Sequence, residues 1–280
     1  MSSQYIKSPL NYTGGKYKLL HEILQLFPKD IETFVDLFGG GFNVGININC
    51  NNIIYNDSCI QVVDLLKHFY NNTPDFVHQS IIDTITNYDL NRAINNKTLN
   101  EYKLNYLKLR NDYNKNPDWI KFYTLITCSF GNQIRFNSNN EFNVPYGKRD
   151  YNLSLQNKLK LFTKELHKKN IQFWNEDFRD CTFLSNDFVY CDPPYYNSVA
   201  TYNENGGWSE QDEKDLLSYL DNIDSHGGKF ALSNNLKCNN PFLKQWKDKY
   251  NIHYLYADYS NCNYHKKDRS QDTEVLITNY

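Results

Sequence analysis

The run Phe188-Val189-Tyr190-Cys191, followed directly by Asp192-Pro193-Pro194-Tyr195, most constrains how this chain can fold. The short apolar run predicts a buried strand. Two consecutive prolines fix the backbone and donate no hydrogen bonds, so the strand must end there in a rigid loop. That loop offers a carboxylate, carbonyl oxygens and an aromatic face. Together these groups suit a planar substrate that carries an amino group.

A glycine-rich segment nearer the N-terminus predicts a ligand-binding turn. Residues 33–41 read as a strand that enters three glycines, and Gly45 follows. Glycines there let a ligand approach the backbone closely. The spacing departs from G-x-G-x-x-G, so it does not specifically predict a pyrophosphate site. A second strand over 53–55 leads to Asp57, and an acidic residue about 20 positions after such a turn can bind ribose hydroxyls.

The segment Asn11-Tyr12-Thr13-Gly14-Gly15-Lys16 precedes a predicted amphipathic helix that Pro28 ends. Lys16 falls in the first turn of this helix, where the helix dipole disfavours a cation. A solvated lysine is the simpler interpretation. Its position beside two glycines instead indicates contact with a ligand.

These three segments, N-Y-T-G-G-K, D-L-F-G-G-G and D-P-P-Y in that order, resemble the Dam family of DNA adenine-N6 methyltransferases of the alpha type. The blocks 131–137 and 141–149 are also similar to Dam, and the resemblance to bacteriophage-type members covers essentially the whole chain. It implies an α/β fold: a Rossmann-like S-adenosylmethionine-dependent methyltransferase sheet. It also implies an inserted, mostly helical target-recognition domain that carries a β-hairpin.

The pattern along the chain agrees with an inserted domain. Strands alternate with helices near 33–57 and again from about 171 to the end, which predicts a doubly wound sheet. The middle region is mostly helical, with a capping box at Thr98-x-x-Glu101 and a helix expected from Asn116-Pro117 to about Phe130. Residues 135–147 predict the hairpin, and a mobile loop is expected over 196–207. We expect a catalytic cofactor-binding domain at 1–59 and 156–280, and a target-recognition domain at 60–155.

Composition narrows the protein class. The 280 residues carry a net charge of −2, which counts mildly against a protein that simply coats nucleic acid. It does not exclude a basic surface on one face of the protein. The 7 cysteines include no C-x-x-C pair, so buried free thiols are expected rather than a metal site or disulfides. No apolar run approaches the ~20 residues of a membrane span. We expect a cytoplasmic protein of a bacterial or virus-infected cell, with no membrane or metal partner.

The resemblance implies S-adenosylmethionine as methyl donor and double-stranded DNA as partner. Asp192 and the Pro193 carbonyl would accept the amino hydrogens of adenine while Tyr195 stacks on the base, and the methyl group would transfer directly. The expected catalytic residues are Asp192, Pro193, Pro194 and Tyr195. The expected cofactor-binding residues are Tyr12, Lys16, Phe38, Gly39, Gly41, Asp57, Phe178 and Asp192.

In duplex DNA the adenine amino group is paired, so the base must leave the stack. Phe130 matches the position of an aromatic residue that fills the resulting gap in Dam-like enzymes. Arg135 and Arg149 flank the predicted hairpin, and arginine reads guanine O6 and N7 in the major groove. Pro145 would contact a thymine methyl group. These matches suggest GATC as the target.

Four other functions compete with adenine-N6 transfer. A cytosine-C5 methyltransferase needs a thiolate, typically after proline, and no proline here precedes a cysteine. A nicotinamide oxidoreductase has no use for Asp-Pro-Pro-Tyr. Cytosine-N4 transfer uses the same amino chemistry and is the nearest alternative, and an inactive DNA-binding relative is the other.

Overall fold

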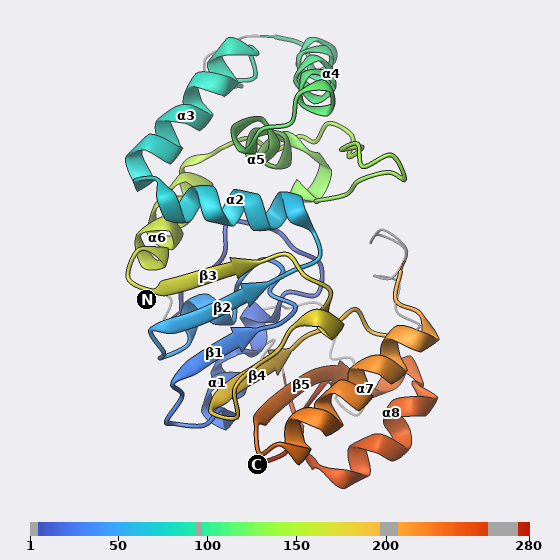
Figure 1. Ribbon diagram of the computed structural model, residues 1–280. Coiled ribbons are helices and arrows are strands. Elements are labelled where there is room, and N and C mark those ends of the chain that lie inside the picture. The colour runs from blue at the N-terminus through green and yellow to red at the C-terminus, as the bar shows by residue number, and fades with distance from the viewer. Residues whose placement is uncertain (1–4, 93–96, 197–206, 257–273) are drawn as a thin grey trace. The chain divides into compact units, whose positions relative to one another are not determined.

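The computed structural model describes residues 5–92, 97–196, 207–256 and 274–280 (Figure 1). The chain divides into two compact units. The helical unit contains Cys59–Lys168 and the residues up to Gly15, and the sheet unit contains Lys16–Ser58 and most of the chain after Lys168. The division therefore falls at Gly15, Cys59 and Lys168, whereas the domains expected from the sequence change at 59 and 155. The loop expected over 196–207 lies almost entirely outside the described residues.

The sheet unit holds a seven-stranded sheet, among the described residues, in the order β3-β2-β1-β4-β5-β7-β6. Strands β3, β2, β1, β4 and β5 run parallel, and β7 runs antiparallel to both β5 and β6. The chain winds outward in both directions from β1 and β4, which makes the gap beyond their carboxyl ends the switch point of the sheet. The α/β class is confirmed. The strands are β1 Thr33–Asp36, β2 Asn52–Asn56, β3 Asn170–Trp174, β4 Asp187–Cys191, β5 Lys229–Asn235, β6 Asn251–Tyr254 and β7 Glu274–Thr278.

Strand β4 is buried along its whole length, as its apolar run predicts. Alternate side chains point to opposite faces of a sheet. Phe188 and Tyr190 therefore pack on one face against Phe27, with ring centroids 4.8 and 5.5 Å away. Val189 and Cys191 join the apolar cluster on the other face, which also contains leucines of α7 and α8. Figure 1 shows these two helices beside β5. The helices of this unit are α1 Leu20–Leu26, α7 Glu210–Ser225 and α8 Pro241–Trp246, with short 3-10 helices at Lys16–Leu19, Gly45–Asn47, Phe178–Asp180, Leu236–Cys238 and Lys247–Lys249.

The helical unit is built around α5, in which every residue from 122 to 128 is buried. A helix that is apolar on all sides needs cover on all sides, and α2, α3 and α4 each pack against it. Helix α6 packs against α3, which places it in this unit. The helices are α2 Ile60–Asn71, α3 Pro74–Asn87, α4 Leu99–Lys115, α5 Trp119–Cys128 and α6 Leu153–Leu166.

Helix ends in this unit confirm one sequence prediction and correct another. Thr98 and Glu101 form the predicted capping box at the start of α4. The prediction that the next helix begins at Asn116-Pro117 is wrong. The N–H of Asn116 donates to the Asp112 carbonyl and closes α4, whereas Asp118 is the N-cap and accepts from the N–H of Lys121 at 2.8 Å. That helix also ends at Cys128, so Phe130 lies in a separate 3-10 helix, Phe130–Asn132.

The predicted hairpin over 135–147 is a narrow loop with a single antiparallel bridge, between Phe136 and Phe142. The N–H of Asn143 donates to the Arg135 carbonyl at 3.2 Å, which continues the pairing. At the tip, the Asn137 side chain accepts from the N–H groups of Asn139 and Glu141 at 3.0 and 2.9 Å. An asparagine that bonds its own backbone in this way stabilises a turn, so the segment reverses direction without forming long strands.

The described residues contain no helix long and apolar enough to cross a membrane. Six cysteines lie in the described parts of the chain, and all of them are free thiols. Cys50, Cys128, Cys181 and Cys191 are buried, where a free cysteine packs as a small apolar side chain.

Candidate active site

Three buried or nearly buried carboxylates gather at the carboxyl edge of the sheet. Asp36 is the last residue of β1, Asp57 follows β2, and Asp192 follows β4. Because these strands are parallel neighbours, their carboxyl ends lie at the same edge. The predicted strand–turn motifs therefore converge at the switch point of the sheet.

Asp192 is paired with Lys16. The Lys16 ammonium lies 2.8 Å from Asp192 Oδ1, and the two side chains are 6% and 17% exposed. Burial raises the pKa of Asp192, and the Lys16 charge opposes that rise. A buried charge needs such a partner. The lysine expected to contact a ligand therefore also braces the carboxylate of the Asp-Pro-Pro-Tyr loop.

Tyr195 lies within the same cluster. Its ring centroid is 5.0 Å from the Lys16 ammonium, and its hydroxyl lies 3.0 Å from Glu274 Oε2 and 3.4 Å from Asp192 Oδ1. Burial raises the pKa of Tyr195 well above its usual value, so the phenol stays neutral and keeps its proton for donation. Sequence reasoning missed Glu274, because it stands far along the chain from Tyr195 and no local motif marks it.

The glycine turn after β1 is held by the two other carboxylates. The N–H of Gly40 donates to Asp57 Oδ2 at 2.8 Å, and the N–H of Gly45 donates to Asp36 Oδ2 at 3.1 Å. The Tyr55 hydroxyl donates to the Gly40 carbonyl at 2.8 Å. Gly41 is buried within this turn. Asp57, expected to bind ribose, thus also fixes the backbone of the turn.

Asp36 is buried next to two other carboxylates. Burial raises the pKa of Asp36 to about 8, and the nearby charges of Asp192 and Asp57 add to the rise. The bond from the Gly45 N–H opposes it. Near neutral pH the folded protein therefore keeps a proton on Asp36, which reduces the negative charge at this edge.

This raised pKa makes stability depend on pH. Unfolded Asp36 releases its proton near 3.8 and folded Asp36 near 8, so its contribution to stability is complete below 3.8 and is lost as pH rises towards 8. Asn mimics the protonated acid, so in Asp36→Asn we expect a free energy of unfolding that varies less over this range. Urea unfolding at a series of pH values measures it. Equal pH dependence in both proteins would show that Asp36 is ionised when folded.

Three aromatic rings form a cluster beside the glycine turn. The ring centroids of Phe38 and Phe178 lie 5.6 Å apart, and Trp208 lies 5.7 and 5.8 Å from them. These are direct ring contacts, so a ligand would lie over the exposed faces of Phe38 and Trp208 rather than between rings. The Trp208 indole N–H donates to the buried Glu213 at 2.7 Å, which fixes the ring. The sequence motifs did not indicate Trp208.

The predicted DNA-contacting residues lie in the helical unit, and the structure brings three of them together. The N–H of Phe130 donates to the Pro145 carbonyl at 2.9 Å, and Arg149 Nη1 donates to Asn132 Oδ1 at 3.0 Å. Phe130 is 62% exposed, and Pro145 and Arg149 are exposed as well. We call the exposed side chains of Phe130, Pro145 and Arg149, whose positions these bonds link, the Phe130 surface.

Two other predicted residues stand apart from these groups. Arg135 Nε donates to Asn143 Oδ1 at 2.7 Å, so part of its guanidinium is engaged within the loop. Tyr12 belongs to the helical unit, where its carbonyl accepts from the N–H of Gly15 at 3.3 Å. The other predicted cofactor residues belong to the sheet unit.

Comparison with known proteins identifies the family. Residues 12–261 match the family model of the D12 class N6 adenine-specific DNA methyltransferases. The chain belongs to this family. It is similar to the type II methyltransferase M.FokI of Planomicrobium okeanokoites, with 44% identity over 100% of this chain and 44% of that protein. It is also similar to the modification methylase StsI of Streptococcus sanguinis, with 38% identity over 100% of this chain and 44% of that protein.

The Dam resemblance is confirmed at the level of the family. The DNA adenine methylase of Escherichia coli strain K12 is 28% identical over 69% of this chain and 66% of that protein. The chain spans less than half the length of M.FokI and StsI. Membership of the D12 class is therefore established for the 280 residues of this chain.

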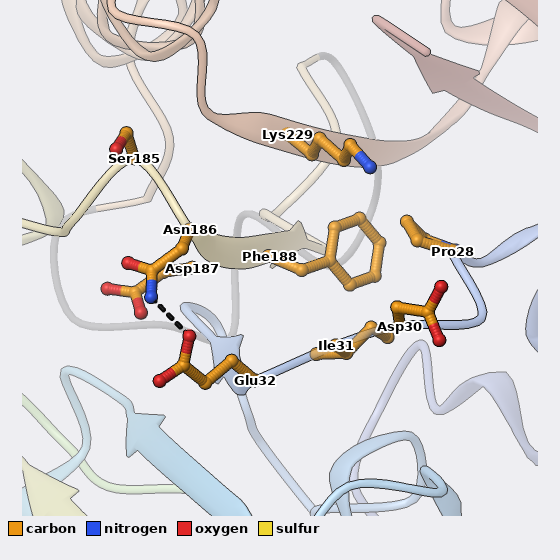
Figure 2. Close-up of a pocket in the computed structure, with 9 residues that line it drawn as sticks. All are labelled: Pro28, Asp30, Ile31, Glu32, Ser185, Asn186, Asp187, Phe188 and Lys229. Carbon is orange, nitrogen blue, oxygen red and sulfur yellow. Dashed lines mark hydrogen bonds between the residues drawn. The ribbon is translucent and has the colours of Figure 1, made fainter.

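A cavity of about 530 Å³ lies at the opposite edge of the D12-class sheet (Figure 2). Glu32, Asp187 and Lys229 line it, each at the amino end of β1, β4 or β5. Figure 2 shows Asn186 beside Glu32, to which its side-chain amide donates. None of the predicted site residues lines this cavity, so we assign it no part in the reaction.

The described residues contain no group of three His, Cys, Asp or Glu side chains arranged to hold a metal. The carboxyl edge of the sheet offers a carboxylate, a close backbone turn and partly buried aromatic rings. These groups suit ribose hydroxyls, a close-lying ligand and a flat adenine ring.

Proposed function

We propose that this protein transfers a methyl group from S-adenosylmethionine to N6 of adenine in duplex DNA. The carrying observation is the Asp192-Pro193-Pro194-Tyr195 loop, with its carboxylate held by a buried lysine at the switch point of the sheet. Membership of the D12 class supports the choice of adenine. The same loop suits cytosine-N4, which remains the competing substrate to be tested.

The chemistry needs acceptors more than it needs a base. The N6 lone pair of adenine is delocalised into the ring, which makes the nitrogen a poor nucleophile. Asp192 and the Pro193 carbonyl accept hydrogen bonds from its two N–H groups and favour a pyramidal nitrogen, which releases one of these protons when it gains the methyl group. Pro194 keeps the loop rigid, and Tyr195 stacks on the base. Positioning and electrostatics then supply most of the rate, with no covalent intermediate on the protein.

S-adenosylmethionine supplies an electrophilic methyl group, and residues of the sheet unit together with Tyr12 would hold it. Asp57 would accept hydrogen bonds from the ribose hydroxyls. The close turn at Gly39 and Gly41 would let the cofactor approach the backbone. Phe38 would cover the adenine ring, with Phe178 behind it. Lys16 and Tyr12 complete the proposed set.

The helical unit would recognise the target. After the adenine leaves the stack, Phe130 would fill the gap, since its side chain is largely exposed. Arg149 and Arg135 would read guanines and Pro145 would contact a thymine methyl group. We propose GATC as the target. Such an enzyme would act in the cytoplasm, where a bacterial or viral genome is accessible.

Expression in a host that lacks adenine methylation tests this proposal, with base-resolved mapping of modified DNA. N6-methyladenine confined to GATC is the expected result. N6-methyladenine in another motif would support transfer to adenine N6 and reject GATC recognition by the Phe130 surface. N4-methylcytosine would move the protein to the competing class, and cofactor binding without any DNA modification would indicate an inactive relative.

Arg149→Ala is expected to relax specificity at one guanine position. A bidentate arginine–guanine contact discriminates by ~1–3 kcal/mol, about 5- to 150-fold in rate ratio. The measurement is the methylation rate on duplexes that differ at single positions. Lys148→Ala is the matched control, because it removes a neighbouring exposed charge. A uniform loss on all duplexes would reassign Arg149 to phosphate contact.

A further inference from the structure

Strand β7 delivers a carboxylate to the site because it runs against the other strands. Glu274 is its first residue and pairs with Asn235, the last residue of β5. An antiparallel strand begins where its neighbour ends. Glu274 therefore lies at the same edge of the sheet as the carboxyl ends of β1 and β4.

Hydrogen bonds hold the Glu274 carboxylate in one orientation. Asn235 Nδ2 donates to Oε1 at 3.0 Å, and the Tyr195 hydroxyl lies 3.0 Å from Oε2. Asn235 is itself fixed, since its Oδ1 accepts from the N–H of Lys237 at 2.9 Å. The Glu274 backbone carbonyl accepts from the N–H of Leu255 at 2.9 Å. The side chain that reaches Tyr195 is thus anchored at both its backbone and its far oxygen.

The Tyr195 hydroxyl has one proton and two carboxylates within reach. Glu274 Oε2 is 3.0 Å away and Asp192 Oδ1 is 3.4 Å away, and only the first distance is that of a strong bond. If Tyr195 donated to Asp192, it would compete with Lys16 for the same oxygen, Oδ1. Donation to Glu274 leaves Asp192 Oδ1 for Lys16 and the other oxygen for the substrate.

We propose that Glu274 is a positioning residue that acts through Tyr195. It takes the tyrosine hydroxyl bond away from Asp192 and holds the ring at the angle that stacks on the target base. This inference rests on the proposed function, since it assigns a role in transfer to an amino group. Glu274 touches neither the cofactor nor the reacting atoms in this arrangement.

A double-mutant cycle between Glu274→Gln and Tyr195→Phe tests the proposal on the full chain. We expect Glu274→Gln to lower the single-turnover methylation rate about tenfold, because a neutral amide oxygen accepts the tyrosine hydroxyl more weakly than a carboxylate does. The KM for S-adenosylmethionine should stay within about twofold. In the Tyr195→Phe background, Glu274→Gln should change the rate by less than about twofold. Glu32→Gln is the matched control, because Glu32 also accepts an asparagine amide, at the opposite edge of the sheet.

A second readout does not depend on methyl transfer. The same four proteins are compared by urea unfolding, where a coupling between the two positions shows that the bond exists. If the two substitutions are coupled in the free energy of unfolding but additive in the methylation rate, Glu274 does not position Tyr195 for the reaction. If they are additive in both measurements, the bond between Glu274 and Tyr195 is rejected as well. A wild-type protein that transfers no methyl group, yet shows coupling in unfolding, would reject the proposed function and not the contact.

Discussion

Asp192→Ala is expected to abolish methyl transfer while the protein still binds DNA. The substitution removes the acceptor that faces the adenine amino group, and loss of one such electrostatic contact typically costs about a hundred- to a thousandfold in rate. DNA binding should persist because the Phe130 surface lies in the helical unit, away in sequence from this loop. Rates are measured in single turnovers, and binding by fluorescence anisotropy on a labelled duplex.

The same substitution leaves Lys16 without its ion partner. The Lys16 side chain is only 6% exposed, and removing one partner of a buried pair destabilises by roughly 3–5 kcal/mol. Asp192→Asn is therefore the second variant to test, because asparagine keeps the shape of the side chain and one acceptor oxygen. Circular dichroism should show both variants folded at the assay temperature. A rate near that of the wild type for Asp192→Ala would reject the mechanism outright.

Gly39→Ala is expected to damage both stability and cofactor binding. A Cβ at this position would lie 2.2 and 2.4 Å from two ring carbons of Tyr55, far inside contact distance. Tyr55 cannot easily move, since it is fully buried and its hydroxyl bonds the Gly40 carbonyl. Overpacking of this kind costs typically ~1–3 kcal/mol, and the displaced turn should bind S-adenosylmethionine at least about tenfold more weakly.

Calorimetric titration with S-adenosylmethionine and urea unfolding measure these two effects. Gly227→Ala is the matched control: its Cβ would meet nothing within 4 Å, although its φ of 77° disfavours alanine. It should lower the free energy of unfolding by about 1–2 kcal/mol through backbone strain and leave cofactor affinity unchanged. Equal affinity in Gly39→Ala and the wild type would show that the turn does not contact the cofactor.

Features set by local chemistry were predictable from the chain. The buried strand before Asp192 follows from its apolar run and the two prolines, and the capping box at Thr98 from the spacing of two side chains. Helix boundaries were less predictable where two nearby residues can each act as an N-cap. Asn116 and Asp118 are both good N-caps, but the Asn116 N–H bonds the end of α4, and α5 therefore has Asp118 as its N-cap.

Contacts between distant residues depended on the order and direction of strands. Lys16 meets Asp192 because the segment before α1 reaches the carboxyl end of β4, and no spacing rule in the chain encodes that. Trp208 contacts Phe38 and Phe178, which lie far from it in the sequence, and no motif in the chain indicates these contacts either. Glu274 reaches Tyr195 because β7 enters the sheet in the antiparallel direction. Short motifs involve only a few neighbouring residues, and their chemistry therefore indicates the reaction from the sequence alone. Which distant side chains complete the site depends on how the strands pack into the sheet.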